Sequence, residues 1–96
     1  MDGLTRVLFR TFGPPAAVIG INQMEMAFEG STARDLLREL EARYEGLGKL
    51  LHPRGEEFSD LLYLLINGKN MLSLDGLDTA VSDGDVVSLL PVTAGG

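Results

Sequence analysis

The 96-residue sequence contains no cysteine and no tryptophan, and it has a single histidine. Without cysteine, the chain has no disulfide, thiolate metal site, iron–sulfur cluster or cysteine nucleophile. The lone His52 has no neighbouring ligand cluster, so neither a Ser-His-Asp set nor an H-E-x-x-H metal motif is present. We therefore expect no bound metal, and we interpret His52 as an exposed loop residue beside Pro53.

Long hydrophobic runs and excess positive charge are also missing. No apolar stretch approaches membrane-spanning length, and the first residues lack the basic and then apolar pattern of a secretory signal. Lys and Arg number 8 against 14 Asp and Glu, which gives a net charge of −6. Nucleic acid needs clustered cations to neutralise its phosphates. The sequence therefore predicts a cytoplasmic protein with no membrane and no nucleic-acid partner.

The composition is that of one globular domain. Hydrophobic residues make up 45% and charged residues 23% of the chain, which is ordinary for a folded protein. A length of 96 residues supports one modest core. We assign residues 1–92 to this domain and residues 93–96 to a flexible C-terminal tail that ends in Gly-Gly.

Two strands are predicted in the first third of the chain. Residues 4–12 alternate in the manner of a strand, with Val7 and Phe9 expected to face the core. Gly13-Pro14-Pro15 indicates a turn that stops both helix and sheet. Residues 19–28 alternate again, so a short loop would join the two strands as an antiparallel hairpin.

After Gly30 the hydrophobic period changes to that of a helix. Ser31 or Thr32 can cap its first turn, and Asp35 adds favourable negative charge there. Gly46 and Gly48 are predicted to end the helix. The apolar stripe consists of Leu36, Leu37, Leu40, Tyr44 and Leu47.

The same helix carries three arginines, Arg34, Arg38 and Arg43, which alternate with acidic residues. Glu39 and Arg43 have the spacing of an i,i+4 ion pair. Interleaved charges of both signs are typical of a solvated helix face, and we prefer that interpretation to a basic binding patch.

The second half of the chain predicts a loop, a strand, a short strand and a final strand. Residues 49–59 have loop composition, and the apolar run of residues 60–66 fits a strand that is buried on both faces or lies in the interior of the sheet. Asn67-Gly68 is a strong turn signal, and a short strand at residues 70–74 follows it. The aspartates of the later turns fit turn chemistry better than a calcium loop. These are Asp75, Asp78, Asp83 and Asp85.

The element order is therefore strand, strand, helix, strand, short strand and strand. One helix packed on one face of a mixed four- to five-stranded sheet buries both apolar surfaces together. A right-handed crossover places the first and last strands side by side in parallel. We predict the α+β class and a β-grasp fold.

The last stretch, residues 86–96, reads VVSLLPVTAGG. Its first part has the composition of a strand, in which Val87 and Leu89 are expected to anchor the chain in the core. Pro91 is expected to interrupt the ladder of hydrogen bonds, so that the tail can project from the sheet. Since the side chains offer no catalytic set, the terminal carboxylate of Gly96 is the remaining candidate reactive group.

Three segments together resemble a known family. They are the Asn67-Gly68 turn, the GLDT and DGD pieces (residues 76–79 and 83–85), and the LLPV-x-AGG ending. In this order and spacing they resemble the molybdopterin synthase small subunits and thiamin sulfur carriers (MoaD/ThiS-like), which are ubiquitin-related β-grasp proteins. The resemblance covers essentially the whole chain.

The resemblance implies a mechanism at the C-terminus. A ubiquitin-activating-type adenylyltransferase would use ATP to adenylate Gly96, which is then converted to a thiocarboxylate, with Gly95 as its slim neighbour. The chain itself would not be catalytic and would hold no permanent cofactor. The large catalytic subunit of molybdopterin synthase would bind the tail and the residues that lead to it. The expected partner-binding residues are Leu90, Pro91, Val92, Thr93 and Ala94.

Alternatives remain open at this point. The leading hypothesis is the small subunit of a molybdopterin synthase. A ubiquitin-like modifier conjugated through Gly96 to lysines would share the same activation, and so would a sulfur donor for thiamin, cysteine or tRNA thiolation. A plain interaction domain with an inert tail is a further alternative. Leu90 is expected to form an exposed docking site, and its alternative is a second buried leucine.

Overall fold

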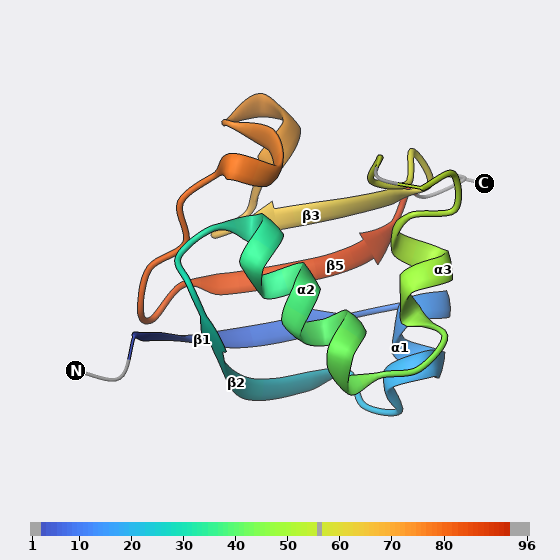
Figure 1. Ribbon diagram of the computed structural model, residues 1–96, viewed down its shortest axis with the longest axis horizontal. Coiled ribbons are helices and arrows are strands. Elements are labelled where there is room, and N and C mark those ends of the chain that lie inside the picture. The colour runs from blue at the N-terminus through green and yellow to red at the C-terminus, as the bar shows by residue number, and fades with distance from the viewer. Residues whose placement is uncertain (1–2, 56, 93–96) are drawn as a thin grey trace.

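The computed structural model describes residues 3–55 and 57–92. Its strands form one five-stranded mixed sheet in the order β2-β1-β5-β3-β4 (Figure 1). The pairing of β1 with β5 is parallel, and every other pairing is antiparallel. The predicted β-grasp arrangement is confirmed. The strands are β1 (Leu4–Thr11), β2 (Gln23–Glu29), β3 (Leu62–Ile66), β4 (Lys69–Asn70) and β5 (Val86–Pro91).

Helix α2 (Ala33–Arg43) crosses one face of this sheet (Figure 1). Its start is fixed by a capping box: the Thr32 Oγ1 accepts a hydrogen bond from the Asp35 N–H at 3.2 Å, while the Asp35 carboxylate accepts one from the Thr32 N–H, also at 3.2 Å. The Ser31 N–H donates to the same carboxylate at 3.1 Å. The bond from the Ser31 N–H, followed by one that the Thr32 hydroxyl donates at 2.9 Å, lowers the pKa of the Asp35 carboxyl below its ordinary value of 3.8.

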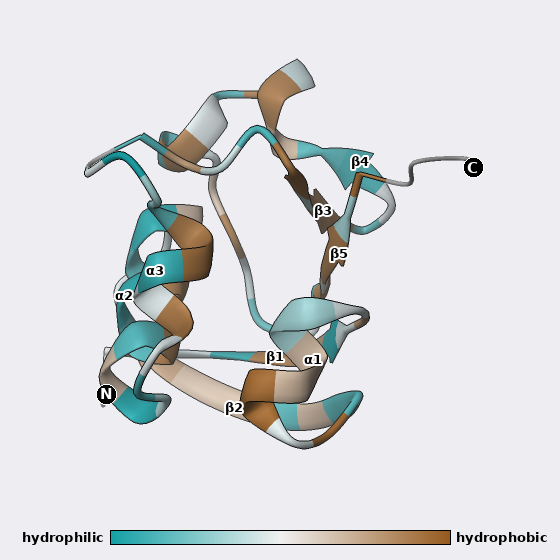
Figure 2. Ribbon diagram, turned by 90° about the vertical axis from the view of Figure 1, so that its right-hand side faces the viewer, coloured by the Kyte–Doolittle hydropathy of each residue, from teal (hydrophilic) through white to brown (hydrophobic). Residues whose placement is uncertain are grey.

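The core lies between α2 and the sheet. Figure 2 shows that β3 and β5 are largely hydrophobic, whereas β4 is hydrophilic. Val7 and Phe9 of β1 are buried, as predicted. The helix contributes four buried residues to the same core, which are Ala33, Leu36, Leu37 and Leu40.

The connection between β1 and β2 differs from the predicted turn. Gly13-Pro14-Pro15 starts a short helix, α1 (Pro14–Ile19), with proline in its first turn. Proline is tolerated there because the first N–H groups of a helix have no intrahelical partner. Ile19, predicted to begin the second strand, is a buried residue of α1 instead, and β2 begins at Gln23. The antiparallel pairing of β1 with β2 is confirmed.

A second short helix, α3 (Leu47–Leu51), lies in part where a loop was predicted. Gly46 precedes it with a φ of 89°, as expected for a glycine beyond a helix end. The prediction that Gly48 ends the helix is wrong, because Gly48 lies inside α3. Leu47 therefore enters the core from α3 and not from α2.

Strand β3 lies in the interior of the sheet, between β5 and β4, as one of the two predicted alternatives had it. It is buried on one face only, so the other alternative, burial on both faces, is wrong. Leu62, Leu64 and Ile66 are buried, whereas Tyr63 is 37% exposed and Leu61, just before the strand, is 70% exposed. Alternation of this kind leaves the outer face of the sheet partly open to solvent.

The turn after β3 follows the prediction, since Asn67 and Gly68 have φ values of 52° and 85°. The short strand that follows is limited to β4, and two 3₁₀ helices, η1 (Met71–Ser73) and η2 (Gly76–Asp78), replace the rest of it. Asn70 favours this change because its side chain accepts a hydrogen bond from the Leu72 N–H at 2.9 Å. No helix in residues 3–55 or 57–92 is long and apolar enough to cross a membrane.

Candidate functional site

The strand that leads to the C-terminus occupies the centre of the sheet. β5 pairs with β1 on one side and with β3 on the other (Figure 1). Val87 and Leu89 are 0% exposed, which confirms that they anchor this segment. In register, Leu89 lies between Thr11 of β1 and Leu64 of β3. The chain is therefore held from both sides immediately before its last residues.

The beginning of β5 is fixed by the turn that ends β3. The Val86 N–H donates to the Asn67 side-chain oxygen at 2.8 Å, and the Asn67 N–H donates to the Val86 carbonyl at 2.7 Å. The Asn67 amide nitrogen donates to the Asp85 carboxylate at 3.0 Å. Asn67 therefore joins the β3–β4 hairpin to the start of β5.

The aspartates before β5 bind backbone groups. Asp83 accepts a hydrogen bond from the Arg6 N–H at 2.8 Å, and Asp85 accepts one from the Ser82 N–H at 2.8 Å. The Asp85 contact agrees with the turn chemistry predicted for it, whereas the Asp83 contact ties the turn to β1. Within the described ranges, no group of three or more His, Asp or Glu side chains is placed to hold a metal ion.

Pro91 does not interrupt the pairing with β3, so this prediction is wrong. It lies opposite Leu62 in the antiparallel ladder, and the Val92 N–H beyond it donates to the Leu61 carbonyl at 2.8 Å. Residues of a strand direct their N–H groups alternately to its two neighbours. The N–H that Pro91 lacks would therefore point toward β1 and not toward β3. Because β1 ends at Thr11, no ladder bond to β1 is lost at this position.

On the side of Pro91 that faces β1, the Pro91 ring lies close to Gly13, just beyond the end of β1. Gly13 has a φ of 70°, and a Cβ atom built on it would lie 2.9 Å from the Pro91 Cγ. Any larger residue at this position would have to displace the ring or the backbone. The two segments are thus fitted to one another at the end of β5.

Apolar side chains gather on the outer face of the sheet at the same end. Leu90 lies opposite Tyr63 in register and is half-buried, so it is not a residue of the buried core. Leu61 and Val92 continue this surface across the same two chain segments. We call Leu61, Tyr63, Leu90 and Val92 the outer-face patch. The docking role of Leu90, Pro91 and Val92 stays a prediction.

Four of the predicted site residues, Thr93, Ala94, Gly95 and Gly96, lie outside the described residues. The roles assigned to them from the sequence stay predictions. The division between a domain at residues 1–92 and a tail at residues 93–96 is likewise a prediction.

His52 is not the exposed loop residue that the sequence suggested. Only 18% of its side chain is exposed, and its Nε2 lies 3.1 Å from the Glu41 Oε2. Its ring also meets Phe58 edge-on, with ring centroids 6.4 Å apart. The contact with Glu41 joins α2 to the segment after α3, and nothing in the local sequence around His52 indicated it.

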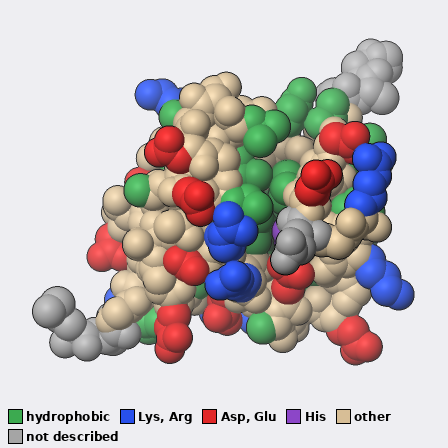
Figure 3. Space-filling model, turned by 45° about the horizontal axis from the view of Figure 1, so that its top comes forward, with side chains coloured by type: hydrophobic (Ala, Val, Ile, Leu, Met, Phe, Trp, Pro, Cys, Tyr) green, Lys and Arg blue, Asp and Glu red, His purple; other side chains and the backbone are tan. Residues whose placement is uncertain are grey.

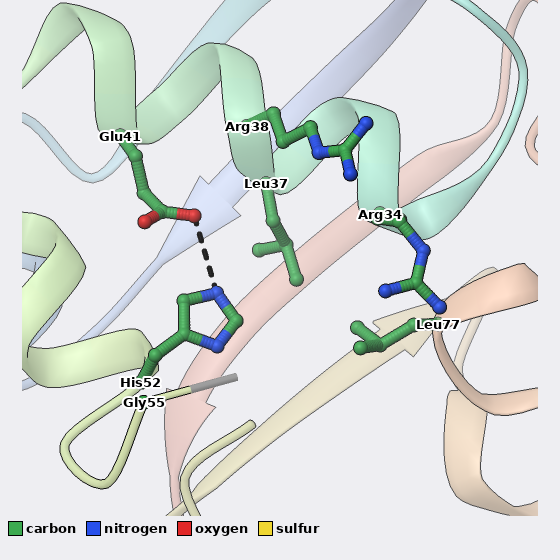
Figure 4. A pocket seen from close by; sticks show the side chains of 7 residues that line it. All are labelled: Arg34, Leu37, Arg38, Glu41, His52, Gly55 and Leu77. Atoms are coloured by element: carbon green, nitrogen blue, oxygen red, sulfur yellow. Dashed lines mark hydrogen bonds and ion pairs between the residues drawn. The ribbon is translucent and has the colours of Figure 1, made fainter. Parts of the chain in front are cut away.

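A cavity of about 360 Å³ opens beside this pair (Figure 4). The sequence does not reveal this cavity, because its walls come from α2, from the loop after α3 and from η2, which only the fold brings together. Arg34 and Arg38 border it, although the sequence placed them on a plain solvated face. We call this cavity the α2 pocket. Its lining residues are Arg34, Leu37, Arg38, Glu41, His52, Gly55 and Leu77.

Comparison with known proteins gives concordant matches. The model of the ThiS family matches residues 10–96. Small archaeal modifier protein 3 of Haloferax volcanii is 44% identical over 68 residues, which cover 71% of this chain and 73% of that protein. Sulfur carrier protein CysO of Mycobacterium tuberculosis is 32% identical over 76 residues, 77% of this chain and 82% of that one. The solution structure of small archaeal modifier protein 1 from Methanosarcina acetivorans has a TM-score of 0.82 at 26% identity, with 97% and 98% of the two chains covered.

Proposed function

The chain belongs to the ThiS family of ubiquitin-like sulfur carriers, and from this premise we propose that its terminal carboxylate on Gly96 is adenylated and then transferred. A free carboxylate is a poor electrophile. An activating enzyme of the ubiquitin-activating type would therefore join it to the α-phosphate of ATP, with release of pyrophosphate. The resulting acyl adenylate has AMP as its leaving group.

The observation that carries this proposal is the place of Gly95-Gly96 in the sequence, a few residues beyond the central strand of the sheet. β5 is paired with β1 as far as Leu89, and on the side of β3 the bonding continues to Val92, so the chain is fixed up to this point. Glycine has no Cβ and can approach the narrow channel of a partner without steric obstruction. The outer-face patch beside this point supplies an apolar surface on which the activating enzyme can dock.

Two fates of the acyl adenylate are open to a protein of this family. In conjugation, the ε-amine of a target lysine displaces AMP and an isopeptide bond forms. The 44% identity to a small archaeal modifier protein supports this fate. We propose it as the first function of the chain.

In sulfur transfer, a sulfur nucleophile displaces AMP and leaves a thiocarboxylate on Gly96. The 32% identity to the sulfur carrier CysO supports this second function. The role as small subunit of a molybdopterin synthase gains nothing from either relative and rests on the resemblance of the sequence alone. This role stays a hypothesis, and so does the binding of the large synthase subunit as a partner.

The experiment is to incubate the purified protein with its activating enzyme, ATP and sulfide, and to measure the intact mass. We expect a gain that corresponds to one oxygen exchanged for sulfur, and no gain when Gly96 is deleted. Formation of the adenylate is followed separately as release of pyrophosphate. If neither product forms with wild-type protein, the proposal is wrong.

The two fates are distinguished in cell extracts. Conjugation leaves Gly96 on lysines of other proteins. Because residues 70–96 contain no Lys or Arg, mass spectrometry of trypsin-digested extracts would detect it as a branched peptide that carries this whole segment. Thiocarboxylate without such lysine adducts would favour sulfur transfer alone. Adducts that persist in cells expressing only the Gly96 deletion would contradict the assignment to this chain.

A further inference from the structure

The α2 pocket combines an apolar floor with two guanidinium groups. Leu37 is 1% exposed and forms part of the floor, and the half-buried Leu77 of η2 lies across from it. Arg34 and Arg38 are four residues apart, which places them one turn apart on the same side of α2. Figure 4 shows both arginine side chains on one side of Leu37, and the His52–Glu41 pair on the other.

Two acidic groups near the pocket, among the residues that the structure describes, are already engaged. The Glu41 carboxylate contacts His52 at 3.1 Å, and the Asp78 carboxylate contacts a terminal guanidinium nitrogen of Arg34 at 3.2 Å. Arg38 makes no hydrogen bond and no ion pair with residues 3–55 or 57–92. Its charge acts on Asp35 only as a minor contribution that lowers the pKa of that carboxyl. The five N–H donors of the Arg38 guanidinium are thus available to a ligand.

From this geometry we propose that the α2 pocket binds an acidic segment of a partner protein that also carries one apolar side chain. A carboxylate of the segment would accept paired hydrogen bonds from Arg38, and its neighbour would lie on Leu37 and Leu77. The volume of about 360 Å³ lies near the lower end of the range for small-molecule pockets, which is about 300–1,000 Å³. Arg38 is exposed at its rim, so the site suits an anchored side chain better than an enclosed metabolite.

The surrounding surface agrees with an extended occupant. Figure 3 shows basic side chains beside a strip of hydrophobic side chains that continues across this face of the molecule. The pocket lies on the side of the sheet that α2 covers, whereas Tyr63 and Leu90 lie on the opposite face. A partner seated in the pocket therefore leaves the outer-face patch free. The site is independent of Gly96 chemistry, and its test needs no activating enzyme.

The test is a titration of ¹⁵N-labelled protein followed by amide chemical shifts. The probe is an acetylated and amidated pentapeptide that alternates aspartate with leucine. We expect saturable shifts at Leu37, Arg38 and Leu77. A matched pentapeptide of lysine and leucine is expected to leave these amides unchanged, and so is citrate at the same carboxylate concentration.

Variants assign the binding to the pocket. Arg38→Gln removes an exposed charge and is expected to lower the affinity for the acidic peptide about fivefold. Arg38→Lys keeps the charge and is expected to recover part of the loss. Arg43→Gln removes an arginine from the same helix outside the pocket lining and is expected to leave the affinity unchanged.

Several results would overturn the proposal. Equal binding of the lysine peptide would show that apolar contact alone is responsible, and equal shifts with citrate would show a site for small anions. Absence of saturable shifts up to millimolar peptide, or an unchanged affinity in Arg38→Gln with an otherwise native spectrum, would remove the α2 pocket from consideration.

Discussion

The two faces of the sheet are built from the same strands and differ completely in their surroundings. On the face covered by α2, Leu64, Val87 and Leu89 are 0% exposed. On the outer face, the alternate residues Tyr63 and Leu90 of the same two strands are partly open to solvent. Because a strand turns successive side chains to opposite faces, β5 can be fixed by one set and recognised by the other. One set of side chains thus supplies the buried core, while the alternate set lies on the open face, where we propose that a partner docks.

The largest expected contrast is between two adjacent leucines of β5. Leu89→Ala removes a fully buried side chain from the middle of the sheet and is expected to lower the free energy of unfolding by about 3 kcal/mol. Leu90→Ala, on the half-buried outer face, is expected to cost about 1 kcal/mol or less. Urea denaturation followed by circular dichroism measures both. Equal losses in the free energy of unfolding would mean that the two faces contribute equally to stability.

A charge on the outer face is expected to affect recognition and leave the fold intact. Leu90→Asp places a carboxylate in the outer-face patch and is expected to weaken binding to the activating enzyme about tenfold. Leu72→Asp is the matched control, because Leu72 is 69% exposed on η1 and outside the patch. Calorimetric titration gives both affinities. If both variants bind like the wild type, the patch is not the docking surface.

The helix that covers the inner face of the sheet is fixed at its start by the Thr32 cap, and loss of this cap is expected to change the stability less than Leu89→Ala does. Thr32→Ala removes the side-chain cap and is expected to lower the free energy of unfolding by about 1 kcal/mol. Thr32→Ser keeps the hydroxyl and is expected to recover most of this loss. Chemical denaturation of the three proteins is the measurement. An alanine variant as stable as the wild type would show that α2 is held by its buried stripe alone.

The smallest effect is a dependence on pH. Hydrogen bonds from Ser31 and Thr32 lower the pKa of Asp35 in the folded protein below 3.8. The ionised carboxylate therefore contributes stability that is complete above pH 3.8 and is lost as the pH falls through the lower folded pKa. Asp35→Asn is expected to reduce the stability difference between pH 6 and pH 3. The same difference in both proteins would contradict this assignment.

Strong local signals explain what the sequence could predict. The alternation around Val7 and Phe9, the cap at Thr32 and the turn at Asn67-Gly68 each combine a periodic pattern with a residue suited to the backbone position. The order of these elements was enough to predict the mixed sheet and its covering helix. The burial of Val87 and Leu89 followed from the same alternation.

The errors have equally local causes. Gly13-Pro14-Pro15 is compatible with a turn and with a helix start, and six residues of α1 are too few for a helical period to decide. The five residues of α3 pose the same problem. The sequence also does not reveal which neighbouring strand faces the position where Pro91 lacks an N–H group. The α2 pocket could not be foreseen, because Arg38, His52 and Leu77 meet only through the tertiary fold.

The central place of β5 has a consequence for how the protein folds. β5 comes after the other four strands in sequence, yet it lies between β1 and β3 and connects them. Until it is available, the β1–β2 and β3–β4 pairs have no shared strand and keep open inner edges. Contacts between segments so distant in the chain form slowly compared with local ones. During synthesis, completion of the sheet therefore awaits β5, so a chain that stops before Val86 lacks the strand that joins the two pairs.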